Sequence, residues 1–438
     1  MLAASLRYGR SHATLDLPDH ADVLRGPEIP ALPDPEAAVR AALRDPIGCR
    51  PLRELVAEAK PETVAITVSD ITRPVPNELL LEALLGELAA AGVPESAVVV
   101  IVATGMHRES TPEERRTMLG GSLPQRLEVV DHTAHRPETV RRVSEDPPVG
   151  VNARFLDADF RVVTGLIEPH FMAGFSGGRK GVCPGLVDLD TVQRFHGVGT
   201  MGDPNSVEGR LEGNPCHEIA TRVAGLVAPE FLLNVAITHD RRAAGVYAGD
   251  LTAAFRAGCA DVARWTSAPV EGPYGLVVTS AGGYPLDKNF YQTVKSMCTA
   301  LPALGPGSTL LVLSACDEVG EPAFEALYDR FGPDWRAFLR HIETSGVTDK
   351  DQWEYQMQTR VLARVGVENL VLANDGLDAA TQRRIATTPC PEPPGSPEAD
   401  AVARAQAFVD AWVEANPGGR VAVIPEGPYT MLSGGSTG

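Results

Sequence analysis

The sequence lacks any Cys-x-x-Cys pair and any long apolar run. Its seven cysteines lie far apart along 438 residues, which excludes a zinc knuckle and argues against a disulfide framework. We therefore expect a reducing, cytoplasmic compartment. Apolar stretches stay shorter than the roughly 18 residues that a membrane-spanning helix needs, and the N-terminal MLAASLRYGRSH has no signal-peptide core. These absences predict a soluble protein.

Positive charge is also scarce. The chain has 39 Lys and Arg against 57 Asp and Glu, a formal net charge of -18. Nucleic acids and anionic membranes bind basic surfaces, so we expect neither as a partner. A local cluster of basic side chains can still bind a small anion. The 44% hydrophobic and 22% charged content is that of a globular protein, and the length suggests two domains.

Apolar runs alternate with helical patterns along the chain, which is typical of α/β proteins with parallel strands. The Pro- and Gly-rich stretch TSAPVEGPYG suggests a boundary, giving domains over 1–268 and 269–438. The predicted fold is therefore two α/β domains with mainly parallel sheets and an active-site cleft between them. We expect strands at 63–68, 97–103, 161–166, 231–238, 276–281, 309–315, 369–373 and 420–424, and helices at 77–92, 111–121, 251–265, from 287, within 322–365 and at 397–415.

Polar side chains follow four of the predicted strands, where ligands bind in open α/β sheets. Asp70 and Arg73 follow the first, His107 the second, and His170 and Lys180 the third, while GGYPLDKNFYQTVK follows the strand at 276–281. Taken singly, these residues have ordinary explanations as a turn pair, loop histidines or a solvated lysine. Their joint occurrence at strand ends indicates a functional site.

The glycine-rich stretch GFSGGRKG, which contains Ser176 and Arg179, matches neither the P-loop nor the Gly-x-Gly-x-x-Gly pattern. Its bare backbone can present N–H groups to a phosphate, with positive charge from Arg179 and Lys180 and a hydroxyl from Ser176. The amine of Lys180 can also serve as a nucleophile or an attachment point.

Two further helices carry candidate residues. His196 stands at the end of a short helix, where an imidazole either complements the helix dipole or binds nickel, copper or zinc. In DKNFYQTVK we expect Asp287 to cap a helix on which Gln292 and Lys295 share a face. That face suits the carboxylate or hydroxyl of a small substrate, and an ordinary exposed amphipathic helix is the alternative.

The stretch PHFMAGFSGGRKGVCPG, together with SDITRP, TGMHR, RFHG and YQTVK, resembles the lactate racemase family of nickel-pincer-nucleotide enzymes over most of the chain. The resemblance implies a nickel-bearing pyridinium-3-thioamide-5-thiocarboxylic acid mononucleotide, tethered at Lys180 through a thioamide, with His196 as the protein ligand to nickel. It also implies that His107 and His170 are paired acid/base residues on opposite faces of the substrate.

The same resemblance implies that Arg73 and Lys295 hold the substrate carboxylate, with Gln292 and Tyr291 nearby. Residues implied to contact the cofactor, besides Lys180, are Asp70, Thr72, Ser176, Gly177, Gly178, Arg179 and Trp353.

The implied activity is that of an isomerase, a racemase or epimerase that inverts C2 of a small anionic 2-hydroxy acid. Hydride transfer to and from the cofactor, with a histidine taking the hydroxyl proton, avoids a dianionic enediolate. Three alternatives stay open: a zinc-dependent hydrolase with His107, His170 and His196 as ligands, a pyridoxal phosphate enzyme with Lys180 as its Schiff base, and a non-catalytic protein that binds a nucleotide cofactor.

Overall fold

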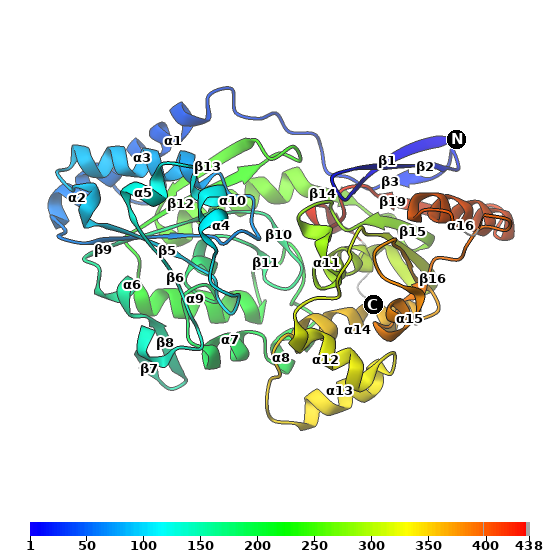
Figure 1. Cartoon of the computed structure of the whole chain (residues 1–438). Helices are drawn as coiled ribbons and strands as arrows, with labels where there is room; N and C mark the ends of the chain where they lie inside the picture. Colours follow the sequence, from blue (N-terminus) through cyan, green and yellow to red (C-terminus); the bar gives the residue numbers. More distant parts are fainter. Residues whose placement is uncertain (397, 435–438) are drawn as a thin grey trace. The chain divides into compact units, whose positions relative to one another are not determined.

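The computed structural model describes residues 1–396 and 398–434 (Figure 1). Their contacts divide the chain into two compact units. The central unit comprises Glu28–His196 and Asp203–Ala263, and the terminal unit comprises Met1–Pro27, Gly197–Gly202 and Arg264–Gly438. The first 27 residues thus belong with the second half of the sequence. The domain boundary placed after residue 268 from the sequence stays a prediction.

The central unit is built on a sheet with the strand order β13-β12-β9-β4-β5-β6. Neighbours are parallel except β13, which pairs antiparallel with β12. Every residue of β4 and of β5 is buried, as expected for parallel strands covered on both faces. The four strands predicted in this part are confirmed. The strands are β4 (Val64–Val68), β5 (Val98–Val102), β6 (Glu128–Asp131), β9 (Phe160–Leu166), β12 (Phe231–Ile237) and β13 (Ala243–Gly249).

Helices α1 (Pro35–Arg44), α2 (Leu52–Ala59) and α3 (Asn77–Ala90) share one apolar core with β4 and β5. Val39, Val56 and Leu84 are fully buried in that core with Ile66 and Val100. The remaining elements of the central unit are α4 (Pro112–Leu119), α5 (Leu123–Arg126), β7 (Val140–Glu145), β8 (Pro148–Asn152), α6 (Ala153–Asp157), β10 (Pro169–His170), β11 (Gly174–Phe175), α7 (Leu189–Phe195), α9 (Pro215–Val227) and α10 (Leu251–Thr266), which runs into the terminal unit.

The terminal unit has a parallel sheet with the strand order β18-β17-β16-β15-β19-β3. Its strands are β3 (Asp22–Val23), β15 (Tyr274–Ser280), β16 (Leu304–Leu313), β17 (Leu370–Ala373), β18 (Thr388–Pro389) and β19 (Val421–Ile424), with β14 (Ser267–Pro269) pairing with β20 (Met431–Ser433). Its helices are α8 (Val198–Gly202), α11 (Phe290–Ala300), α12 (Pro322–Phe331), α13 (Trp335–Thr344), α14 (Gln352–Val365), α15 (Ala379–Arg384) and α16 (Ala401–Ala415).

Two helix starts differ from the sequence-based prediction. Asp287 does not cap α11; Asn289 does, because its side chain accepts from the N–H of Gln292 while Asp287 lies in a preceding 3-10 turn. The last helix was predicted over 397–415. Residue 397 lies outside the described residues, and α16 begins at Ala401 after Asp400, whose carboxylate accepts from the N–H of Ala403.

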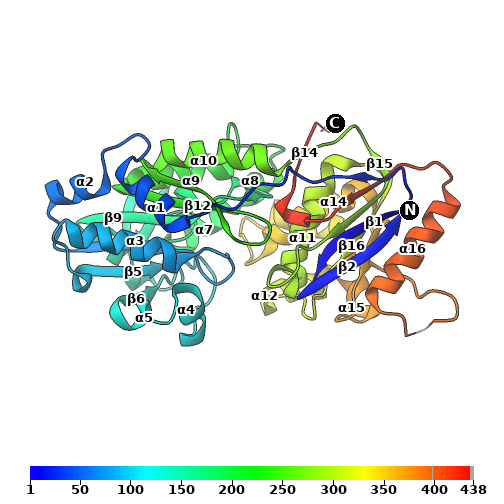
Figure 2. The ribbon, with the colours of Figure 1, turned by 90° about the horizontal axis from the view of Figure 1, so that it is seen from above.

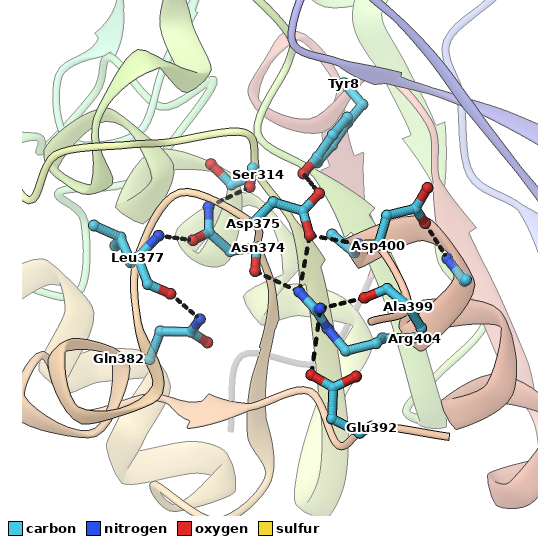
Figure 3. A network of polar contacts seen from close by, with 12 residues as sticks. Tyr8, Ser314, Asn374, Asp375, Leu377, Gln382, Glu392, Ala399, Asp400 and Arg404 are labelled. Atoms are coloured by element: carbon cyan, nitrogen blue, oxygen red, sulfur yellow. Dashed lines mark hydrogen bonds and ion pairs between the residues drawn. The ribbon is translucent and has the colours of Figure 1, made fainter. Parts of the chain in front are cut away.

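The sequence analysis did not anticipate a hairpin formed by β1 (Leu2–Tyr8) and β2 (Ser11–Leu17), which lies beside α16 in Figure 2. The Tyr8 hydroxyl donates to Oδ2 of Asp375 over 3.1 Å, within the polar network at the ends of β16 and β17 (Figure 3). The N–H of Gly9 donates to Oδ2 of Asp287 over 2.7 Å. These contacts explain why the first residues belong to the terminal unit.

Candidate active site

Asp70 and His107 meet at the carboxyl ends of β4 and β5, which are adjacent parallel strands. Oδ2 of Asp70 lies 2.5 Å from Nδ1 of His107. The hydroxyl and the N–H of Thr72 both donate to Oδ1 of Asp70, over 2.5 and 3.2 Å. Both carboxylate oxygens of Asp70 are therefore engaged in hydrogen bonds, and the two strand-end residues lie side by side.

The electrostatics fix how this pair is protonated. Burial alone raises the pKa of Asp70, but the charge and hydrogen bond of His107 and the hydrogen bonds of Thr72 outweigh it, so the pKa falls to about 2. A carboxylate that is ionised near neutral pH only accepts hydrogen bonds, so Nδ1 of His107 carries the proton. In the neutral form of the ring the lone pair is then on Nε2. Because the His107 side chain is 48% exposed, its ring is accessible to a small molecule.

His170 follows β9 in the chain, and its side chain is buried and contacts Lys180. Its Nε2 lies 2.7 Å from Nζ of Lys180. Its Nδ1 accepts from the N–H groups of Ala173 and Met172, over 3.3 and 3.4 Å. Nε2 of His170 and Nζ of Lys180 are therefore joined by a hydrogen bond, whose direction follows from the tautomer of the ring.

Arg73 and Glu168 form an ion pair that the sequence analysis missed. Nε of Arg73 lies 3.1 Å from Oε1 of Glu168, and the hydroxyl of Ser176 donates to the same oxygen over 3.3 Å. Arg73 follows β4 and Glu168 follows β9, the neighbouring strand on the side opposite β5. The chain order reverses at this place in the sheet, which is where open α/β sheets bind ligands.

The glycine-rich loop GFSGGRKG packs closely against other side chains of the central unit. Gly177 and Gly178 have φ values of +82° and +54°, and a Cβ on Gly178 would lie 2.5 Å from the Phe255 ring. The N–H of Gly178 donates to Oδ1 of Asn234 over 2.7 Å. Close packing within the protein therefore accounts for both glycines. Their contact with a cofactor stays a prediction.

Arg179 is directed into the same loop. Its guanidinium is buried and donates to the carbonyls of Ala173 and Phe175 over 2.7 and 2.8 Å, with Phe255 stacked 4.4 Å away. Burial lowers the pKa of Arg179 to about 10, which leaves it charged near neutral pH. Arg179 thus shapes the loop from within, and its role at a cofactor phosphate stays a prediction.

His196 caps the C-terminal end of α7, as the sequence predicts. Its Nδ1 lies 3.0 Å from the carbonyl oxygen of Val192. Because a carbonyl only accepts, Nδ1 carries the proton and the lone pair is on Nε2. Burial lowers the pKa of His196 to about 3, and positive charge on Lys180 and His107 contributes. His196 is therefore a neutral imidazole, the form that binds metals.

The remaining predicted residues lie in the terminal unit. On α11 and α14, Nε1 of Trp353 donates to the hydroxyl of Tyr291 over 2.9 Å. The side-chain oxygen of Gln292 is buried and, among the described residues, has no hydrogen-bond partner. The carbonyl of Lys295 accepts from the Thr299 hydroxyl one turn later on α11. A buried amide oxygen without a partner suits a ligand that donates a hydrogen bond.

Within residues 1–396 and 398–434, three or more His, Cys, Asp or Glu side chains do not gather in any group that could hold a metal ion. A zinc site with His107, His170 and His196 as joint ligands needs such a group. Over the same residues, no helix is both long enough and apolar enough to cross a membrane.

The fold and the site define an α/β enzyme with two histidines at strand ends. One of them is hydrogen-bonded to a carboxylate and the other to an amine. The chain belongs to the lactate racemase family. The model of the lactate racemase N-terminal domain matches residues 8–209, and that of the C-terminal domain matches residues 271–427. The protein is accordingly an isomerase of the racemase type, which excludes the non-catalytic alternative.

Two relatives are named lactate racemase. The one from Thermoanaerobacterium thermosaccharolyticum is 33% identical over 83% of this chain and 86% of its own length. The one from Lactiplantibacillus plantarum is 33% identical over 78% of this chain and 80% of its own length.

Solved structures show the same fold. The lactate racemase apoprotein from T. thermosaccharolyticum superposes with a TM-score of 0.87 and 29% identity, covering 99% of this chain and 100% of that chain. A protein from Thermotoga maritima, 18% identical, matches with a TM-score of 0.66 over 91% of this chain and 98% of its own, and it supports the fold alone.

Proposed function

We propose that this racemase inverts C2 of a small 2-hydroxy acid by hydride transfer, with His107 and His170 as the acid/base pair. The observation that carries the proposal is the placement of the two imidazoles after β5 and β9, the strands on either side of β4. Nδ1 of each ring is hydrogen-bonded, and we assign proton exchange to Nε2.

His107 is arranged as a base. Its Nε2 takes the hydroxyl proton of one enantiomer, and the anionic Asp70 at Nδ1 stabilises the imidazolium that forms. His170 is the proton-accepting residue for the opposite enantiomer. Hydride leaves C2 as the hydroxyl proton leaves, so the bound molecule becomes a planar 2-keto acid. The second histidine begins the cycle as an imidazolium; return of the hydride to the other face, with the proton of that imidazolium, completes the inversion, and the two rings have then exchanged protonation states.

The residues present fit a tethered nickel-pincer nucleotide. His196 is a neutral imidazole with its lone pair on Nε2, which suits one protein ligand to nickel. The amine of Lys180 lies 2.7 Å from Nε2 of His170, a group that can take the proton which the amine loses on attachment. When bound, the nucleotide would supply the hydride acceptor. Forming a thioamide removes the positive charge of the amine, so Nε2 of His170 would then no longer face an ammonium group.

Arg73 supports the binding of a carboxylate, because its guanidinium offers terminal N–H donors at the β4 end. Lys295, Gln292 and Tyr291 complete the predicted substrate contacts, and Asp70, Thr72, Ser176, Gly177, Gly178, Arg179 and Trp353 the predicted cofactor contacts. The relatives' names make lactate the first substrate to test. Malate, larger 2-hydroxy acids and sugar acids belong to the same chemical class. The cytoplasmic location and an active-site cleft stay predictions.

The experiment loads the protein with nickel-pincer nucleotide and incubates it with single enantiomers of lactate, malate, larger 2-hydroxy acids and aldonates. Chiral chromatography should show inversion of at least one compound and none with the protein lacking cofactor. Borohydride trapping at Lys180 would instead favour a pyridoxal phosphate Schiff base. No inversion across the series would contradict the proposal.

A further inference from the structure

We propose that Glu168 is a positioning residue: its carboxylate holds Arg73 in the orientation that receives the substrate carboxylate. This inference rests on the proposed function, because it takes Arg73 to bind the carboxylate of a 2-hydroxy acid. The family resemblance and the spacing in the sequence point to Arg73 but not to Glu168. Glu168 is identified by its ion pair with Arg73 in the structure.

The contact is made on one side of the guanidinium. Oε1 of Glu168 lies 3.1 Å from Nε of Arg73. Among the described residues, the hydrogen bonds of the terminal nitrogens of Arg73 are limited to one with the carbonyl of Thr72, over 3.4 Å. The edge with the two terminal nitrogens is the one that binds a carboxylate in two parallel hydrogen bonds. Glu168 therefore fixes the side chain without using that edge.

Glu168 is itself held in place. The Ser176 hydroxyl donates to Oε1, and the Ser176 N–H donates to the Glu168 carbonyl over 2.9 Å. The side chains of Glu168 and Arg73 are only 16% and 21% exposed. The carboxylate thus has a defined position, set by the loop that also carries Lys180.

A fixed arginine binds a carboxylate more tightly than a mobile one. The long side chain of arginine loses rotamer freedom when it is immobilised. If Glu168 imposes that loss during folding, substrate binding does not have to meet it. Removing the carboxylate should therefore raise the KM for the 2-hydroxy acid about tenfold, while kcat changes by less than about twofold.

The test compares wild type, Glu168→Ala and Glu168→Gln after equal cofactor loading. A second readout is the affinity for 2-hydroxyisobutyrate, which has no hydrogen on C2 and cannot react, measured by calorimetry. We expect both variants to weaken its binding about tenfold. Glu168→Asp keeps the charge on a shorter side chain and should restore part of the affinity. If Glu168→Ala does not fold, Glu168→Asp provides the test in its place.

The matched control is Glu230→Gln. Glu230 pairs with Arg161 over 2.6 Å, in an ion pair of similar exposure at the opposite end of β9. This variant should leave KM unchanged. The positioning role also predicts that Glu168→Ala has no further effect on affinity in an Arg73→Ala background, whereas an independent role gives additive losses.

The outcomes separate this inference from the proposed function. If wild type neither inverts 2-hydroxy acids nor binds the analogue, the proposed function fails. If wild type does both, an unchanged KM in Glu168→Ala overturns the positioning role. A lowered KM also overturns it, because Glu168 would then compete with the substrate for Arg73.

Discussion

Asp70 and His107 are joined by a 2.5 Å contact between Oδ2 and Nδ1, although they follow different strands. The contact gives the ring one tautomer and one orientation. Because the pKa of Asp70 lies at about 2, its side chain is an anion near neutral pH. The pair is therefore a preset base rather than two separate polar residues.

Asp70→Asn should lower turnover about 100-fold, because an amide no longer enforces the Nδ1–H tautomer or stabilises the imidazolium. The measurement is kcat of the loaded enzyme with lactate or the best substrate found. Asp240→Asn, at an exposed carboxylate paired with Arg242, is the control and should leave kcat unchanged. Turnover of Asp70→Asn within threefold of wild type would remove Asp70 from the proposed chemistry.

Lys180→Ala should abolish covalent attachment of the nucleotide, because the loop offers the Lys180 amine beside His170 as the attachment point. Intact-protein mass spectrometry after loading should show the adduct in wild type and only the unmodified mass in the variant. Lys288→Ala removes an exposed lysine and should keep the adduct. An adduct that persists in Lys180→Ala would place the attachment elsewhere.

Gly178→Ala should destabilise the protein by at least about 2 kcal/mol, because the new methyl group would meet Phe255 at a positive φ. Gly225→Ala, inside α9 with open space around its Cβ, should instead stabilise it by up to about 1 kcal/mol. Denaturant unfolding measures both. If the two variants have equal stability, the packing account of the loop glycines is wrong.

Lowering the pH should destabilise the protein through the buried histidine His132. Burial lowers the pKa of His132 to about 4 from 6.5, although the Val187 carbonyl and the charge of Asp188 oppose the shift. The unfolded chain therefore binds the proton first, and stability falls as the pH drops from about 6.5 to about 4, by about 3 kcal/mol for this group. His132→Gln should flatten that slope, whereas the exposed His20→Gln should not. Equal slopes in unfolding experiments over this range would refute the assignment.

The sequence contained enough information for the central sheet and its strand-end residues. VAITV and VVVIV are uniformly apolar because both faces of β4 and β5 are covered, and parallel neighbours bring Asp70 and His107 to one edge. Glu168 could have been found by the same argument, since it follows β9 closely. Its partner Arg73 is distant in sequence, so no local pattern distinguishes Glu168 from an ordinary loop residue.

Other features depend on contacts that no local pattern encodes. The β1–β2 hairpin packs on α16 at the far end of the chain, and Asp16 and Gln406 hydrogen-bond across that contact. The direction of Arg179 into the loop depends on which carbonyls turn inward and on the position of Phe255. Tertiary packing therefore determines both the position of the hairpin and the direction of Arg179.

The central claim is that hydrogen leaves C2 as hydride and returns to the same molecule. Inversion of a 2-hydroxy acid deuterated at C2, run in ordinary water and analysed by chiral separation with mass spectrometry, tests it directly. We predict that the product enantiomer keeps its deuterium. Replacement of that deuterium by solvent hydrogen would mean that C2 is deprotonated, and would contradict the roles given to His107 and His170.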